Sequence, residues 1–417
     1  MTAQGSESSG GTSTPAILDI DPFTEQVLAD PYPFHQALRE TGAVVWLKPY
    51  GIYATGRDDM VRTVMADHTR FITGAGTGLY DLRKPGAWRP KSPLLEVDPP
   101  EHTALRTTLT RILSPLVVRK WRADFEAAAE RIADRIVEMG EFDGVKDLAE
   151  AFVLTVFPRS IGVDIPHENA VAIGDMNFNA IGPNNEIFRR SLAKVEPILE
   201  WYQKSFQRES MLPGGFGEQI YQAQDAGDLP PESAPGLVRS FIRGGMDTTI
   251  AGIGFALNQL ARNPEQWGMI QADPTKARGA FEEAIRHESP SQTQFRTSLG
   301  PTNLGGLDIE GDTKIAVFIG AANRDPRKWE RPDAFDITRQ TTGVHLAFGS
   351  GAHVCIGNMI ARLEADVILA ALAKRVIAFE LAGEPSYRII NTLRTLKVLP
   401  LRIVKAVRPT RVIGETK

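Results

Sequence analysis

The chain has 417 residues, of which 42% are hydrophobic and 24% are charged, and its formal net charge is −4. This composition is ordinary for a globular protein, and its mild acidity gives no reason to expect binding to nucleic acid. No run of 18 apolar residues occurs, so the sequence predicts no membrane span. A single cysteine excludes a disulfide framework and suits a reducing compartment, so we expect a cytoplasmic protein.

The N-terminal segment is rich in Ser, Gly and Thr and lacks the basic and apolar regions of a signal peptide. We expect a disordered tail over residues 1–18. No linker-like segment divides the remainder of the chain, so residues 19–417 are expected to form a single domain.

Hydrophobic periodicity predicts a mainly α-helical domain with a minor β part. The first elements are a short helix over residues 33–41 and short strands over residues 44–55. Apolar spacing of three and four then predicts helices over residues 100–113, 116–139, 143–161, 167–181, 190–209, 216–226, 232–263 and 274–287. Strands are expected over residues 293–318 and 377–404, with a last helix between them.

The single cysteine, Cys355, lies in a glycine-rich loop that opens into this last helix. Backbone N–H groups at a helix N-terminus favour a thiolate, the form that ligates iron. A lone cysteine is also commonly a small buried hydrophobe or a free nucleophile, but flanking glycines disfavour ordinary core packing. The loop resembles the haem-binding loop of the cytochrome P450 family at Phe348, Gly351, His353, Cys355 and Gly357.

Two further segments strengthen the resemblance. Glu283 and Arg286 share one helix face and can pair, although such pairs are often only surface contacts. They resemble the family's Glu-x-x-Arg pair, which would pack with Arg339 and support the cysteine loop structurally.

The second segment is Gly244-Gly245-Met-Asp247-Thr248 within the expected long helix. Paired glycines disfavour a helix by about 1 kcal/mol each, so they indicate a close ligand or a close helix crossing. The segment resembles the family's oxygen-binding groove, where dioxygen would lie over the glycines. Thr248 would hydrogen-bond the bound oxygen and Asp247 would help relay protons. Relatives that use peroxide typically carry Arg-Pro instead of this acid–alcohol pair, which favours an electron-fed monooxygenase here.

The resemblance covers residues 19–405 and implies the cytochrome P450 fold, a triangular helix-rich prism with small β-sheets. It also implies haem b as cofactor, with the Cys355 thiolate on the iron. Buried propionates need charge-assisted donors. The positions that match propionate-binding residues are His102, Arg106, Arg296 and His353. Phe348 and Gly357 are expected to contact the haem as well.

One subgroup fits more closely, the bacterial enzymes that O-demethylate para-substituted benzoates such as 4-methoxybenzoate. A carboxylate in an apolar pocket needs a cation and hydroxyl donors. The expected substrate contacts are Arg89, Ser92, Leu94, Leu95, Phe178, Ile181, Ser240, Arg243, Gln294 and Leu393.

Three of these positions depart from the subgroup. Gln294 and Ile181 stand where aromatic residues are usual, and Arg243 replaces a small polar residue. Gln294 suits a ring with an additional hydroxyl or methoxy group, as in lignin-derived aromatics. Arg243 either strengthens anion binding or points outward. The alternatives left open are a monooxygenase of neutral methoxyphenols of the guaiacol type and a haem-binding sensor or electron carrier.

Electrons must come from another protein, because one cysteine cannot hold an iron–sulfur cluster. The resemblance implies a separate ferredoxin and an NAD(P)H-dependent ferredoxin reductase. Arg119, Lys120 and Arg122 are candidate docking residues on the cysteine side.

Overall fold

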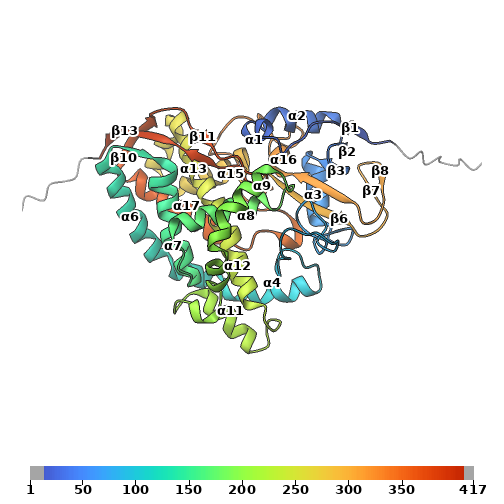
Figure 1. The fold of residues 1–417 in the computed structure, drawn as a ribbon. Coiled ribbons are helices and arrows are strands. Elements are labelled where there is room, and N and C mark those ends of the chain that lie inside the picture. The colour runs from blue at the N-terminus through green and yellow to red at the C-terminus, as the bar shows by residue number, and fades with distance from the viewer. Residues whose placement is uncertain (1–13, 408–417) are drawn as a thin grey trace, which may run out of the picture.

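The structure, a computed structural model, describes residues 14–407 and has a triangular outline, with a sheet-rich part beside a larger helical part (Figure 1). The α-helices are α1 (Glu25–Ala29), α2 (Tyr32–Thr41), α3 (Asp58–Ala66), α4 (Glu101–Ile112), α5 (Pro115–Lys120), α6 (Arg122–Met139), α7 (Ala151–Ile161), α8 (His167–Asn179), α9 (Glu186–Val195), α10 (Leu199–Lys204), α11 (Phe216–Asp225), α12 (Ala234–Gly245), α13 (Asp247–Arg262), α14 (Pro264–Ala272), α15 (Ala277–Glu288), α16 (Ile319–Ala322) and α17 (Asn358–Ala373). The strands are β1 (Ala16–Leu18), β2 (Val45–Leu47), β3 (Ile52–Thr55), β4 (Phe71–Ile72), β5 (Glu141–Asp143), β6 (Thr293–Ser298), β7 (Thr302–Leu304), β8 (Leu307–Ile309), β9 (Lys314–Phe318), β10 (Val376–Leu381), β11 (Ser386–Tyr387), β12 (Leu396–Val398) and β13 (Pro400–Ala406).

The largest sheet has six strands in the order β1-β2-β3-β9-β6-β4. Strand β9 lies inside it and is buried on both faces, because its side chains alternate between two apolar clusters. Phe318 faces the cluster that contains Phe34 of α2, whereas Val317 faces the cluster that contains Val61 of α3. Helices α2 and α3 therefore cover opposite faces of the sheet.

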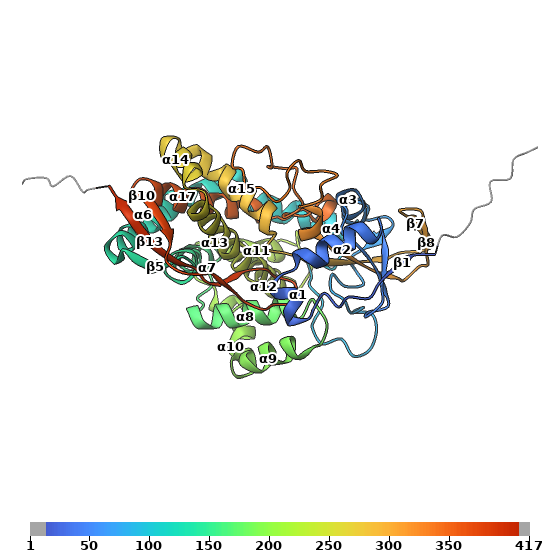
Figure 2. The same cartoon turned by 90° about the horizontal axis from the view of Figure 1, so that it is seen from above.

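Helix α13 forms the centre of the helical part and packs against α15 and α17. It is buried around almost its whole circumference, and small residues let its neighbours approach closely. At Gly252 an added Cβ would lie 2.6 Å from the ring of Phe281 on α15. Figure 2 shows the same body from above, with α9 and α10 at the edge opposite α14.

The mainly α architecture and the positions of most elements are confirmed, including the hairpin of β7 and β8. The continuous helix over residues 232–263 is wrong, because α12 ends at Gly245 and α13 starts at Asp247. Helix 116–139 also divides, at Trp121, and strand β5 and a π-helical turn (Gly144–Glu150) occupy the start of segment 143–161.

The expected tail includes residues 1–13, which lie outside the described residues. Its last residues form β1, which pairs in parallel with β2, so ordered structure begins before residue 19. Within residues 14–407, no helix combines the length and apolar character that crossing a bilayer demands.

Candidate active site

A large cavity, partly open to solvent, joins most of the predicted site residues. The space between its lining residues, including the solvent at its open side, amounts to about 1610 Å³. Its wall contains His102, Arg106, Phe178, Ile181, Leu94, Leu95, Ser240, Arg243, Gly244, Gly245, Thr248, Gln294, Arg296, Phe348, His353, Cys355 and Gly357. Arg89, Ser92, Asp247 and Leu393 are not part of this wall.

Cys355 reaches the cavity from the loop that precedes α17. Its backbone N–H donates to the Phe348 carbonyl at 2.8 Å, and Gly349 and Gly351 adopt positive φ angles of 78° and 72°. The loop also packs tightly on α3, because a Cβ on Gly351 would lie 2.5 Å from Ala66 Cα. Glycine is therefore required at position 351 both for the turn and for the contact.

The surroundings of the thiol act on its pKa in opposite directions. Burial raises the pKa of Cys355, whereas the N–H groups of Gly357 and Asn358 and the charge of Arg106 lower it. The net shift is upward, so these groups offset the effect of burial only in part. A bound metal cation deprotonates a coordinating thiol outright.

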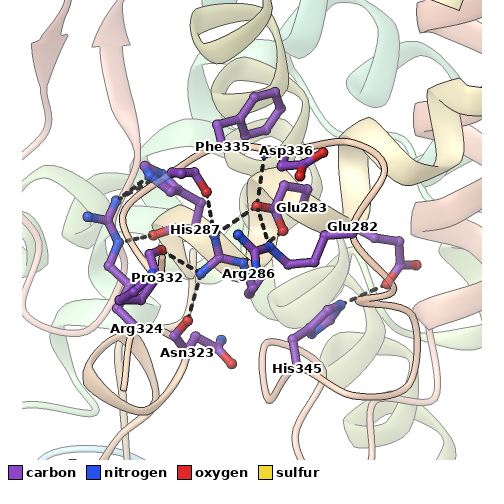
Figure 3. Close-up of polar contacts among 12 residues, drawn as sticks. Glu282, Glu283, Arg286, His287, Asn323, Arg324, Pro332, Phe335, Asp336 and His345 are labelled. Carbon is purple, nitrogen blue, oxygen red and sulfur yellow. Dashed lines mark hydrogen bonds and ion pairs between the residues drawn. The ribbon is translucent and has the colours of Figure 1, made fainter. Parts of the chain in front are cut away.

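The polypeptide that leads to this loop is held by Arg286 (Figure 3). This side chain is 0% exposed, and its five N–H donors are all used. Two of them bind the Glu283 carboxylate at 2.8 Å each, and the others bind the carbonyls of Asn323, Pro332 and Ala334 at 2.8–3.2 Å.

Two other groups extend this network. The Arg339 guanidinium donates to Glu283 at 3.3 Å, as the resemblance implied. Beside them, His345 contacts Glu282 at 2.7 Å (Figure 3), and Arg362 of α17 also binds Glu282. None of these residues lines the cavity, which agrees with a structural role.

Two arginines and two histidines lie on the cavity wall near Cys355. The Arg106 side chain has no hydrogen bond or ion pair within residues 14–407, and the Arg296 side chain donates only to the carbonyl of Phe295, at 2.8 Å. The His102 and His353 rings lie 4.0 Å apart. Burial, with the charges of Arg296 and His102, lowers the pKa of His353 to about 3, and burial lowers the pKa of Arg296 to about 10.

Arg106 is half-buried and Arg296 is buried, and neither has a carboxylate partner among residues 14–407, which is unfavourable unless an anion joins them. A cofactor with carboxylate groups supplies that charge. The arrangement of these cations around a large cavity that also exposes one thiol therefore fits a haem with two propionates.

The break between α12 and α13 borders the same cavity. A Cβ on Gly244 would meet nothing within 4 Å, whereas one on Gly245 would lie 2.1 Å from the Phe157 ring. Gly244 therefore leaves open space, and Gly245 allows a close helix crossing. The Thr248 hydroxyl donates to the Gly244 carbonyl at 2.8 Å, and such back-bonding weakens the regular helix at this point.

Asp247 points away from the cavity into a buried pocket. A Cβ on Gly174 of α8 would lie 2.1 Å from its carboxylate, so a glycine is needed there. One oxygen of Asp247 has no hydrogen-bond partner, and the other lies 4.0 Å from Arg388, which also binds Asp175. Burial raises the pKa of Asp247 to about 7, against the attraction of Arg388.

The expected carboxylate-binding residues divide into two groups. Ser240 and Arg243 line the cavity. Arg89 is instead held behind the wall by two hydrogen bonds to Glu96, and Ser92 contacts Ser240 at 3.3 Å between their hydroxyls. Leu393 lies in the cluster that supports Phe178 and Ile181 from behind.

Sequence reasoning missed two buried acids. Glu364 lines the cavity, neither of its oxygens has a partner within the described residues, and burial raises its pKa well above the usual range. One sequence feature could have indicated Glu364. It follows Ile360 by four residues and Ala361 by three, so it shares the apolar face of α17 with them. Glu96 gave no local signal.

Comparison with known proteins agrees with this geometry. The model of the family described as "Cytochrome P450" matches residues 217–392. The chain is 44% identical to cytochrome p450 CYP199A2 of Rhodopseudomonas palustris over 391 residues, which cover 93% of this chain and 95% of that protein. It is 31% identical to cytochrome P450 107B1 of Saccharopolyspora erythraea over 77% of this chain and 80% of that one.

A solved structure extends the likeness to three dimensions. Cytochrome P450 CYP109Q5 from Chondromyces apiculatus aligns with a TM-score of 0.76 and 28% identity, over 93% of this chain and 98% of that one. Members of this family bind haem through a cysteine thiolate, and this chain has one cysteine, at the wall of the cavity. The chain belongs to the cytochrome P450 family and is a haem-dependent monooxygenase.

Proposed function

We propose that this monooxygenase O-demethylates a small aromatic acid of the para-methoxybenzoate type, including lignin-derived methoxyaromatics. One oxygen atom of dioxygen is inserted into a C–H bond of the methoxy group. The resulting hemiacetal collapses to a phenol and formaldehyde. The other oxygen atom leaves as water, with two electrons and two protons. The observation that carries the proposal is a cavity with aromatic and aliphatic walls and a cationic group, Arg243, on α12.

The cofactor is haem, with Cys355 as the iron ligand. When bound, haem supplies the activation of dioxygen and the oxidation of the C–H bond. Two arginines and two histidines would donate hydrogen bonds to its propionates, and Phe348 and Gly357 would contact the ring. The four are His102, Arg106, Arg296 and His353.

The break in the helix provides the groups that deliver protons. Gly244 leaves space at the wall, and the Thr248 hydroxyl is within reach of that space. Asp247, the preceding residue, has a pKa of about 7 because it is buried, so it is partly protonated at neutral pH and can pass a proton on. Because Asp247 lies behind the wall, its proton would reach Thr248 through a rotation of the side chain or through water.

The apolar part of the wall orients the ring. Phe178 offers an aromatic face with Leu393 packed behind it, and Leu94 and Leu95 form the aliphatic side. The Gln294 amide donates to Ser291 Oγ at 3.2 Å and keeps its carbonyl oxygen for a second polar substituent on the ring. We therefore propose that a ring hydroxyl or additional methoxy group is accepted near Gln294.

We propose that electrons come from a separate ferredoxin and its NAD(P)H-dependent reductase. Arg119 and Lys120 are exposed on the short helix α5, and Arg122 follows at the start of α6. Exposed basic groups would steer an acidic partner toward this side.

Turnover with a surrogate ferredoxin and reductase tests the proposal. With NADH and 4-methoxybenzoate we expect equal amounts of 4-hydroxybenzoate and formaldehyde. Demethylation of guaiacol without demethylation of the acid would favour the neutral methoxyphenol alternative. Intact haem with no product from either substrate would favour a sensor or an electron carrier.

A further inference from the structure

We propose that Arg243, rather than Arg89, binds the substrate's carboxylate. This inference rests on the proposed function and names the residue that selects an acid over a neutral aromatic. The inference depends on a difference between two arginines of the described site. Arg89 already has an anionic partner, whereas Arg243 has none.

Arg89 is already paired. Its side chain is 7% exposed and makes two hydrogen bonds to Glu96, which is 0% exposed. Burial opposes ionisation of Glu96, but the hydrogen bonds and charge of Arg89 outweigh it and lower the pKa of Glu96 to about 2. Glu96 also accepts from the backbone N–H groups of Thr77 and Ser92, at 2.9 and 2.7 Å. The pair is thus a closed neutral unit behind the wall, and it fixes the segment from which Leu94 and Leu95 reach the cavity.

Arg243 has the opposite character. Its guanidinium is at the cavity wall, and no hydrogen bond or ion pair to it occurs within residues 14–407. Burial and the nearby charge of Arg89 lower the pKa of Arg243 to about 10, so it remains protonated at neutral pH. A largely desolvated cation without a counter-ion destabilises the free protein and attracts an anion that enters the cavity.

The other cations of the wall have a different assignment. His102, Arg106, Arg296 and His353 are near Cys355, where the haem propionates would neutralise them. Among the residues that line the cavity, Arg243 is therefore the cation left for a substrate.

The neighbouring side chains complete an anion site. Ser240 lies three residues before Arg243, on the same face of α12, and its hydroxyl also lines the cavity. The Ser240 hydroxyl donates to the Gly236 carbonyl at 2.8 Å and lies 3.3 Å from the Ser92 hydroxyl. A carboxylate would accept from the guanidinium, and from the Ser240 hydroxyl once that hydroxyl turns away from the Gly236 carbonyl, and the aromatic ring would extend toward the apolar wall.

The test is a binding titration of the haem-loaded protein, followed by the Soret band. The ligands are 4-methoxybenzoate and its methyl ester, and the variants are Arg243→Gln and Arg243→Lys. The matched control is Arg239→Gln, because Arg239 lies one turn earlier on α12, loses the same charge and is not part of the cavity wall.

We expect Arg243→Gln to weaken binding of the acid by about 10-fold or more, the usual effect of losing a charge-assisted hydrogen bond. Binding of the ester should change little, Arg243→Lys should retain part of the affinity, and Arg239→Gln should leave the preference for the acid intact. Without ligand, Arg243→Gln should melt at the same or a higher temperature than the wild type, because an unpaired buried charge is removed. A purely structural arginine would instead lower that temperature.

The outcomes separate this inference from the proposed function. A wild type that prefers the acid, with an Arg243→Gln variant that keeps the preference, overturns the role of Arg243 and leaves O-demethylation standing. Binding of the acid that depends on Arg243 but yields no formaldehyde supports the anion site and overturns O-demethylation. A wild type that binds acid and ester equally overturns the anion site.

Discussion

Arg286 and Arg243 are both withdrawn from bulk water, but their surroundings differ completely. Arg286 is at 0% exposure with every N–H donor satisfied by Glu283 and by three carbonyls. Arg243 faces the cavity and has no side-chain partner within the described residues. A saturated buried charge holds a fold in one arrangement, whereas an unsaturated one is costly and is retained where a ligand completes it.

The largest expected effect comes from replacing Arg286, the arginine whose N–H donors are all satisfied. Arg286→Leu removes the two shortest hydrogen bonds of the buried Glu283 carboxylate and leaves Arg339, at 3.3 Å, as its cationic contact. Removing one partner of a buried ion pair typically costs about 3–5 kcal/mol. The segment before the cysteine loop also loses three carbonyl contacts. We expect little or no haem-loaded protein, measured as the ratio of Soret absorbance to protein absorbance.

A second variant identifies the cause of that loss. Arg286→Lys keeps the charge but offers three donors in place of a planar fork, so it should recover only part of the haem content. Full recovery with lysine would mean that charge alone matters and that the bidentate geometry does not.

These two arginines also show how far the sequence could predict the site. The pair of Glu283 and Arg286 is visible in the sequence because residues three apart share a helix face. The cysteine loop is visible for a similar reason, since its residues are contiguous. The pairing of Arg89 with Glu96 depends on how an irregular loop turns back on itself, and no periodicity encodes this.

The environment of Asp247 was likewise beyond prediction. Arg388 and Gly174 come from the end of β11 and from α8, distant in sequence, and only the tertiary structure brings them to the acid. The two glycines in the sequence indicated a weak point between α12 and α13, but they did not give the position of the interruption. Its position depends on the hydroxyl of Thr248, which competes for a helix carbonyl.

Asp247, like Arg243, is an ionisable side chain without a full set of hydrogen-bond partners. Its contribution to the free energy of unfolding depends on pH. Its pKa of about 7 in the folded protein exceeds the ordinary value of 3.8 for an aspartate side chain. Between these two values the folded state binds more protons than the unfolded state, so the stability contributed by protonated Asp247 is lost as pH rises toward 7. Relative to Asp247→Asn, the wild type should lose roughly 2–3 kcal/mol of unfolding free energy from pH 5 to pH 8.

Denaturant titrations of both proteins at several pH values measure this difference. Parallel curves for the wild type and Asp247→Asn would show that Arg388 and Asp175 keep the acid ionised throughout. Asp175→Asn, which leaves Arg388 free to approach Asp247, should shift the transition to lower pH.

The glycine against Asp247 allows the same pocket to be disturbed without any change of charge. In Gly174→Ala the new methyl group would lie 2.1–2.3 Å from the carboxylate, so Asp247 or α8 must move. Overpacking of this kind typically costs about 1–3 kcal/mol. We expect a lower melting temperature and poorer coupling of NADH use to product, because the proton donor is displaced. Gly214→Ala is a poor control because of its positive φ, whereas Gly268→Ala on α14 adds a methyl group to open space and should be neutral.

The smallest effect is expected where an arginine has a good partner but remains in water. Arg402 contacts Glu380 at 2.5 Å across β13 and β10, with side chains 52% and 47% exposed. Such pairs contribute little and weaken with salt, because water solvates both charges when they separate. Arg402→Gln should therefore leave the melting temperature almost unchanged, and 1 M NaCl should reduce the remaining difference. A loss as large as that of Arg286→Leu would mean that partner geometry, rather than desolvation, separates the structural arginines of this protein from its surface ones.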